Sequence, residues 1–119
     1  MDEGKIAAVV HRFYGRVRQD PLLAPIFEGA IADWDHHLDL LGAFWSSVML
    51  TSGRYKGNPL AAHVKHAPHL TPDAFARWLA LWEATTSEIL PPDEAAEMQS
   101  RARRIAASLQ LGVQIRAAA

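Results

Sequence analysis

The sequence contains no cysteine among its 119 residues. The absence of thiols excludes disulfide bridges, thiolate metal clusters, a cysteine nucleophile and a cofactor attached through thioethers. Six histidines are present, so any metal must be bound through imidazole, carboxylate or phenol groups. The length fits a single domain with one small core, and we expect residues 1–119 to form it.

Long hydrophobic runs and an excess of charge of one sign are also missing. The longest stretch without Asp, Glu, Lys or Arg covers residues 40–53 and contains four hydroxyl side chains and two glycines, so it is too short and too polar to span a bilayer. Twelve Lys and Arg residues face thirteen Asp and Glu residues, which removes the long-range attraction that binders of nucleic acids and acidic lipids use. No apolar signal segment follows the charged residues Met1–Lys5. We expect a cytoplasmic protein without nucleic-acid or membrane partners.

Hydrophobic residues recur at helical spacing and show no strand-like alternation, which predicts an all-α fold with four main helices and shorter pieces. The main helices are expected over residues 3–18, 34–50 and 72–90, and after the Pro91-Pro92 pair as far as Gly112. The segment between Pro21 and Ile31 is apolar and rich in proline and glycine. It is expected to form a tight corner that packs on the core.

Residues with capping side chains mark the starts of two of the main helices and of one short helix. Asp33 precedes the second main helix, and Thr71-Pro72 precedes the third. Asn58-Pro59 repeats the pattern of a capping residue followed by a proline in the first turn. It predicts a short helix through His63 that closes before Pro68.

Four different helices each direct a ring with a polar atom toward the core, namely Tyr14, His37, His63 and Trp78. Each has an ordinary explanation, since aromatic residues at helical spacing are usually packing and a lone inward histidine is most often a satisfied core residue. Together they are harder to explain, because each buried donor without a partner costs about 1–3 kcal/mol. A planar cofactor that carries a metal would supply the missing partners.

The histidines His63, His66 and His69 allow a different interpretation, a zinc or nickel site made by three imidazoles. Pro68 interrupts the helix before His69, and no Asp or Glu lies between Asn58 and Thr71 to complete the ligand set. The cluster is therefore an alternative and not the favoured hypothesis.

A third interpretation is a helical interaction or DNA-binding module without any cofactor. Arg101, Arg103, Arg104 and Arg116 could form a basic edge on the last helix. Glu94 and Glu97 lie on the same helix, so the edge is also explained as an ordinary solvated face.

Four blocks of residues follow one another over nearly the whole chain: Phe13-Tyr14-x-x-Val17-x-x-Asp20-Pro21-Leu22-Leu23-x-Pro25-Ile26-Phe27, Trp34-x-x-His37-x-x-x-Leu41-x-x-Phe44-Trp45, Tyr55-x-Gly57-x-Pro59-x-x-x-His63 and Phe75-x-x-Trp78-Leu79-x-Leu81. Together they resemble the truncated haemoglobins, and most closely the third group of that family. The paired-glycine motifs typical of the other two groups are missing. The resemblance implies a shortened, all-α globin fold, a two-over-two helical sandwich around a non-covalent haem b.

The resemblance also implies a role for individual residues. His63 matches the proximal ligand of the haem iron, and His66 is the alternative ligand if the loop register differs. His63 is favoured because it follows the Tyr-x-Gly-x-Pro block at the spacing of the family. Tyr14, His37 and Trp78 match the distal pocket, where donors stabilise negative charge on a diatomic ligand. The remaining lining of the haem site is expected from Phe27, Leu41, Phe44, Trp45 and Tyr55.

The function that the resemblance implies is that of a monomeric haem protein that reversibly binds dioxygen, nitric oxide and carbon monoxide. Oxygen transport is one expected role, but strong distal hydrogen bonding suits ligand chemistry or sensing better than bulk delivery. Nitric oxide dioxygenase or peroxidase-like activity is a further possibility. Such turnover needs an external reductase, since 119 residues cannot also hold a reductase domain.

Overall fold

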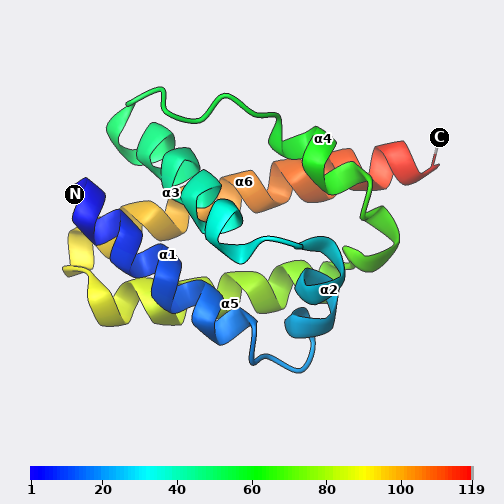
Figure 1. Cartoon of the computed structure of the whole chain (residues 1–119), viewed down its shortest axis with the longest axis horizontal. Helices are drawn as coiled ribbons and strands as arrows, with labels where there is room; N and C mark the ends of the chain where they lie inside the picture. Colours follow the sequence, from blue (N-terminus) through cyan, green and yellow to red (C-terminus); the bar gives the residue numbers. More distant parts are fainter. Residues whose placement is uncertain (119) are drawn as a thin grey trace.

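The computed structural model describes residues 1–118, with side chains up to Ile115. These residues form α-helices and a single 3₁₀ turn, and no strand occurs among them (Figure 1). The elements are α1 (Glu3–Val17), α2 (Leu23–Ala30), α3 (Trp34–Leu50), α4 (Pro59–Val64), the turn η1 (Ala67–His69), α5 (Pro72–Ile89) and α6 (Pro92–Ala118). The all-α prediction is confirmed.

The capping residues act as the sequence predicts. The side chains of Asp33, Asn58 and Thr71 each accept a hydrogen bond from the backbone N–H three residues further on, at the starts of α3, α4 and α5. Pro59 and Pro72 occupy the first turn of their helices, where a missing N–H costs nothing. The short helix α4, which carries His63, is thereby fixed at its N-terminus.

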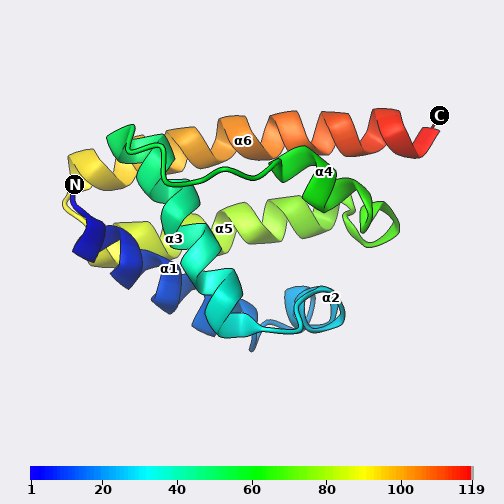
Figure 2. The same cartoon turned by 45° about the horizontal axis from the view of Figure 1, so that its top comes forward.

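The main helices form two pairs that stack on each other. α1 packs against α3, α5 packs against α6, and α1 also contacts α5. Figure 2 shows α6 running alongside α5, with α1 on the other side of α5 and α3 crossing in front of it. The 27 residues of α6 rise about 1.5 Å each, which accounts for the 40 Å length of the molecule. This is the two-over-two arrangement that the resemblance implies.

A fully buried aromatic cluster joins the two pairs. Phe13 of α1 contacts Trp82 of α5 edge to face with ring centroids 4.8 Å apart, and Trp45 of α3 stacks on the same indole at 4.5 Å. All three side chains are at most 1% exposed. Trp78, one turn before Trp82, stacks on it at 5.5 Å. The cluster therefore fixes the position of Trp78, which lines the candidate site.

The segment after α1 differs from the prediction, because the expected corner contains the eight-residue helix α2. The buried Asp20 carboxylate accepts hydrogen bonds from the N–H groups of Leu22 and Leu23 and from the Arg77 guanidinium. Pro25 lies in the first turn of α2, where its lack of an N–H is tolerated. The proline and glycine content of this segment suggested a loop. The helix forms because Asp20, which precedes it, accepts hydrogen bonds from the N–H groups at its start.

We expect Asp20→Ala to lower the free energy of unfolding by about 1–2 kcal/mol, the usual cost of losing a capping side chain. Burial raises the pKa of the Asp20 carboxyl, but hydrogen bonds from Arg77 and the Leu23 amide outweigh it and bring the pKa below its ordinary 3.8. The contribution of Asp20 is therefore complete above that value and is lost as the pH falls through the lower, folded-state pKa. Urea unfolding at neutral and acidic pH measures both effects. An Asp20→Ala protein as stable as the parent at neutral pH would contradict this prediction.

The last helix is longer than predicted, because α6 continues through Gly112 to Ala118. The glycine does not end the helix but gives room to a neighbour. A Cβ at residue 112 would lie 2.6 Å from a methyl carbon of Leu60, so the missing side chain lets α4 approach α6 closely. The cost of a glycine inside a helix, about 1 kcal/mol relative to alanine, is offset by this packing.

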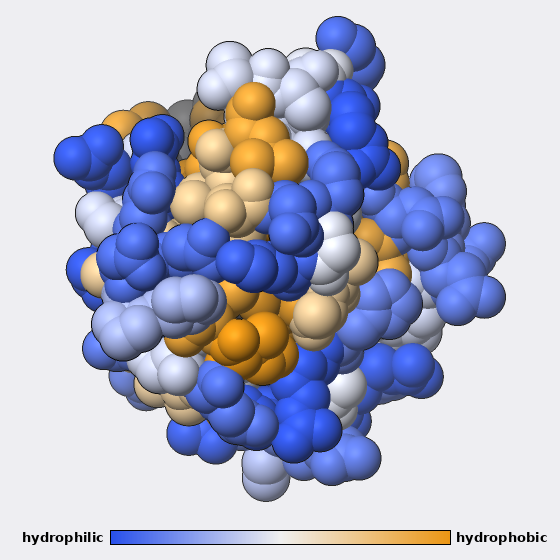
Figure 3. All heavy atoms as spheres, turned by 90° about the vertical axis from the view of Figure 1, so that its left-hand side faces the viewer, coloured by the Kyte–Doolittle hydropathy of each residue, from blue (hydrophilic) through white to orange (hydrophobic). Residues whose placement is uncertain are grey.

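The surface near the N-terminus is mainly hydrophilic with small hydrophobic areas (Figure 3). The amino group of Met1 contacts the Glu94 carboxylate at 2.6 Å, and Lys5 contacts the same carboxylate at 3.0 Å. These ion pairs tie the start of α1 to the start of α6. Within residues 1–118, no helix is both long and apolar enough to cross a membrane.

Candidate functional site

A cavity of about 330 Å³ lies between the two helix pairs and is closed from below by α4 and α6. Its volume falls within the roughly 300–1,000 Å³ that is usual for sites of organic ligands. The lining is largely apolar and includes no Asp or Glu. All nine residues that the resemblance places in the cofactor site line this one cavity: Tyr14, Phe27, His37, Leu41, Phe44, Trp45, Tyr55, His63 and Trp78.

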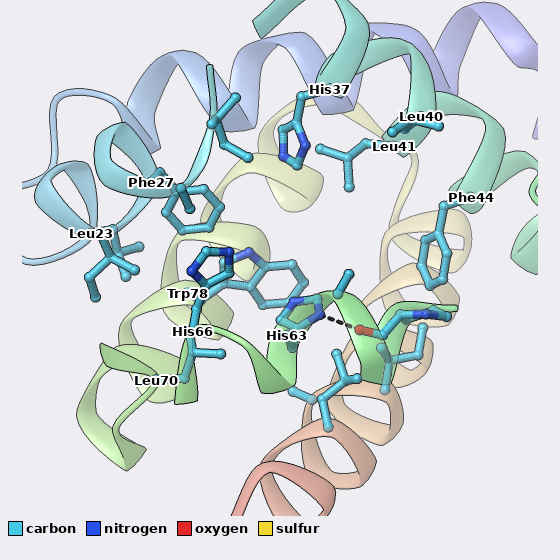
Figure 4. Close-up of a pocket in the computed structure, with 18 of the residues that line it drawn as sticks. Leu23, Phe27, His37, Leu40, Leu41, Phe44, His63, His66, Leu70 and Trp78 are labelled. Carbon is cyan, nitrogen blue, oxygen red and sulfur yellow. Dashed lines mark hydrogen bonds between the residues drawn. The ribbon is translucent and has the colours of Figure 1, made fainter. Parts of the chain in front are cut away.

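His63 enters the cavity from α4 (Figure 4). Its Nδ1 lies 2.6 Å from the carbonyl oxygen of Pro59. A carbonyl oxygen can only accept, so Nδ1 carries the proton and donates it, which leaves a lone pair on Nε2. A backbone carbonyl that fixes the tautomer and the ring orientation in this way is typical of histidines that bind a metal.

The other two histidines of the sequence cluster lie in different surroundings. His66 also lines the cavity, whereas His69 is exposed in η1. Within the described residues, no group of three His, Asp or Glu side chains is placed to hold a metal ion. The alternative of a three-histidine zinc or nickel site is therefore wrong for this fold, because α4 already ends at Val64 and His69 lies exposed in the separate turn η1.

The opposite side of the cavity is formed by aromatic rings from α1, α2 and α3. His37 points into the cavity from α3, facing the side from which His63 enters (Figure 4). Tyr14 of α1 contacts the His37 imidazole with ring centroids 5.6 Å apart and contacts Phe27 at 5.7 Å. Trp78 of α5 closes the wall between the two sides. Polar ring atoms from three helices thus face one imidazole from α4.

Both titratable groups on this side are neutral at pH 7. Burial raises the pKa of the Tyr14 phenol, against a smaller lowering by a hydrogen bond with Trp78. Burial, followed by the nearby His63 and His36, lowers the pKa of His37 below its ordinary 6.5. Tyr14 therefore keeps its proton and can donate it in a hydrogen bond, and His37 is an uncharged imidazole.

Two buried polar atoms near the cavity have no partner within the protein, Nε2 of His37 and Nε1 of Trp34. A buried donor or acceptor without a partner costs about 1–3 kcal/mol, so a partner supplied from outside the chain would stabilise these atoms. For His37, which lines the cavity, a ligand in the cavity supplies that partner. The residues present fit a planar, apolar cofactor with a metal at its centre. His63 can bind the metal, apolar walls can hold the plane, and donors lie on the far side.

Tyr55 and Phe44 form the end of the cavity beside the loop that leads to α4. The Tyr55 N–H donates to the Ser47 hydroxyl at 2.9 Å, and the two rings meet edge to face at 5.2 Å. A Cβ at Gly57 would lie 2.5 Å from the Tyr55 hydroxyl. The glycine of the Tyr-x-Gly-x-Pro block is thus required by the ring that precedes it.

The basic edge predicted on the last helix is partly neutralised. Arg101 contacts Glu97 at 3.7 Å on the surface of α6. The side chain of Arg116 lies outside the described residues. Nothing in this arrangement supports a nucleic-acid interface.

The sequence did not identify the floor of the cavity. Ile105, Ala106 and Leu109 of α6 line it, together with Leu70 and Phe75. Their helical spacing predicts only that they face inward, and a helix that faces a cofactor has the same hydrophobic period as one that faces a packed core. His66 and Lys65 also line the cavity, and His66 was considered only as an alternative ligand.

Comparison with known proteins gives a consistent result. No family model matches the chain. The chain is 32% identical over 114 residues to a group 3 truncated haemoglobin from Campylobacter jejuni, covering 92% of this chain and 89% of that protein. The crystal structure of a group III truncated haemoglobin from the same organism superposes with a TM-score of 0.85 at 31% identity, covering 95% of this chain and 91% of that one. The predicted truncated globin fold is confirmed.

Proposed function

Because this chain belongs to the group III truncated haemoglobins, we propose that it binds haem b non-covalently in the cavity and reversibly binds dioxygen, nitric oxide and carbon monoxide there. The single observation that carries this proposal is the state of His63. Its imidazole lies in the apolar cavity with Nδ1 bonded to the Pro59 carbonyl. A histidine in this state has its other ring nitrogen available as an iron ligand.

In the proposed complex, haem supplies an iron atom at which diatomic gases bind. His63 holds the iron, and the Pro59 carbonyl keeps the imidazole in the required orientation. Phe27, Leu41, Phe44, Trp45 and Tyr55, which line the cavity, would exclude water from the bound cofactor. The absence of Asp and Glu from the lining also favours a cofactor that carries carboxylates of its own.

On the distal side the protein offers hydrogen-bond donors in a largely apolar space. Tyr14 offers its O–H, and the indole N–H of Trp78 donates to the Tyr14 oxygen and so supports it; both residues line the cavity. Fixed donors in a dry site stabilise negative charge on a small ligand strongly, because they need no reorganisation when it binds. His37 can donate to the ligand or move aside to admit it.

Hydrogen bonds from these distal donors would slow the release of the ligand. Slow release suits a reaction of the bound ligand, or sensing, better than bulk oxygen transport. Nitric oxide dioxygenation or peroxidase-like turnover would need electrons from an external reductase. We propose that the protein acts as a monomer in the cytoplasm, with diatomic gases and this reductase as its partners.

The visible spectrum tests the proposal. We expect the purified protein, supplied with haem, to show an intense Soret band that shifts when carbon monoxide is added to the reduced form. Neither a helical interaction module without a cofactor nor a protein that binds only zinc or nickel would give this band. Its absence after haem supplementation would refute the proposed function.

A further inference from the structure

A cation lies on the outer face of the distal wall. The Arg18 guanidinium, just after α1, lies 4.5 Å from the centroid of the Trp34 ring at the start of α3. The Nε of Arg18 also lies 3.4 Å from a Glu28 carboxylate oxygen on α2. The Arg18 side chain is 47% exposed, so these contacts form at the surface of the molecule. They link α1, α2 and α3 at the place where the chain turns around the distal side.

The inner side of the same indole touches the distal residues. Trp34 meets His37 edge to face with ring centroids 5.6 Å apart, and it stacks on Phe27 at 6.4 Å. Trp34 is half-buried, and it does not itself line the cavity. The ring therefore lies between the surface cation Arg18 and the histidine that does line the cavity.

Among the described residues, none forms a hydrogen bond that would hold the His37 side chain in its inward position. Its Nε2 is buried and has no partner in the protein, so the orientation of the ring depends on packing. The packing partners are Tyr14 and Trp34, whose ring centroids each lie 5.6 Å from that of His37 and 6.2 Å from each other. Tyr14 belongs to the buried core, whereas Trp34 lies near the surface. Of the two rings that pack against His37, Trp34 is therefore the one that can move.

From this arrangement we infer that Arg18 and Trp34 form a latch that keeps His37 turned into the cavity and so sets the rate at which diatomic ligands enter and leave. Arg18 pins the indole from outside, and the indole blocks outward rotation of the imidazole. Arg18 contacts neither the cavity nor any ligand in it, so it is a positioning residue. The kinetic part of this inference rests on the proposed function, and the part that concerns the orientation of His37 does not.

The size of the effect follows from the exposure of the contact. A cation above an indole at an exposed site shifts an equilibrium by about two- to fivefold. Removing Arg18 should raise the fraction of molecules with His37 turned outward by that factor. A side chain that only controls passage, without binding the ligand, speeds entry and exit equally when it turns outward more often, so the affinity stays constant.

Arg18→Ala in the haem-loaded protein tests the latch. We expect the association and dissociation rates of carbon monoxide to rise together by about two- to fivefold, with no change in their ratio. Modification of His37 by diethyl pyrocarbonate, mapped by mass spectrometry with and without haem, should accelerate by a similar factor. The exposed neighbour His36 should react at an unchanged rate. Arg18→Lys, which keeps the charge but loses the flat guanidinium, should fall between Arg18→Ala and the parent.

Arg12→Ala is the matched control. Arg12 is an exposed arginine of α1 that pairs with Glu88 and is not stacked on Trp34, so its removal should change none of these rates. Unchanged modification of His37 in Arg18→Ala overturns the latch, whatever the ligand rates do. Equal acceleration in Arg12→Ala also overturns it. A protein that binds no haem would refute the proposed function alone, because modification of His37 in the haem-free chain still decides the latch.

Discussion

Replacing His63 with alanine is expected to abolish haem binding or weaken it greatly. The imidazole is the group on the α4 side whose orientation a backbone carbonyl fixes. Losing only the hydrogen-bond partner of a metal-ligating histidine typically costs about 10- to 100-fold in affinity. Loss of the ligand itself should exceed this range. Titration of the haem-free variant with haem, followed at the Soret band, measures the change.

His66→Ala is the matched control for this experiment. His66 lies three residues further on and lines the same cavity, but among the described residues its ring has no hydrogen bond that would orient it. We expect the His66→Ala protein to keep its haem. Free imidazole should partly restore haem binding to His63→Ala, because it can fill the space that the side chain leaves. Unchanged haem affinity in His63→Ala would refute the assignment, and loss of haem in His66→Ala alone would transfer it to His66.

The helix starts could be predicted because their causes are local. Asp33, Asn58 and Thr71 cap their helices through hydrogen bonds that span three residues, and this spacing is visible in the sequence. The helix α2 was missed because the carboxylate that starts it, Asp20, is held by Arg77 from a distant helix. Gly112 was misinterpreted as a helix end for the same reason. Its role depends on Leu60, which periodicity cannot place.

The candidate site was predictable in its members but not in its geometry. Polar rings on four helices suggested a shared partner, and the ordered blocks of the resemblance selected the same residues. The choice of His63 over His66 as the ligand is supported by the hydrogen bond from His63 to the Pro59 carbonyl. The sequence alone does not show this contact. Trp34 appeared in the sequence only as the first residue of the block that contains His37. Its position between Arg18 and His37 arises from the way three elements meet.

Tyr14→Phe is expected to speed dioxygen dissociation by about ten- to hundredfold. The Tyr14 phenol is 4% exposed, and burial raises its pKa, so it remains a protonated donor. A hydrogen bond to an acceptor that carries charge contributes about 1.5–3 kcal/mol, and each 1.4 kcal/mol corresponds to a factor of about ten. Phenylalanine keeps the ring that packs on Phe13 and Phe27. The substitution therefore removes the donor and leaves the wall in place.

Stopped-flow displacement of dioxygen by carbon monoxide measures this rate, and the chain provides a close control. Its other tyrosine, Tyr55, lines the same cavity, but its hydroxyl packs against Gly57. Tyr55→Phe should leave the dissociation rate of dioxygen unchanged. The Tyr14→Phe effect should also be much smaller for carbon monoxide, because that ligand gains little negative charge on binding. An unchanged dioxygen rate in Tyr14→Phe would leave Trp78 or His37 as the group that retains the ligand.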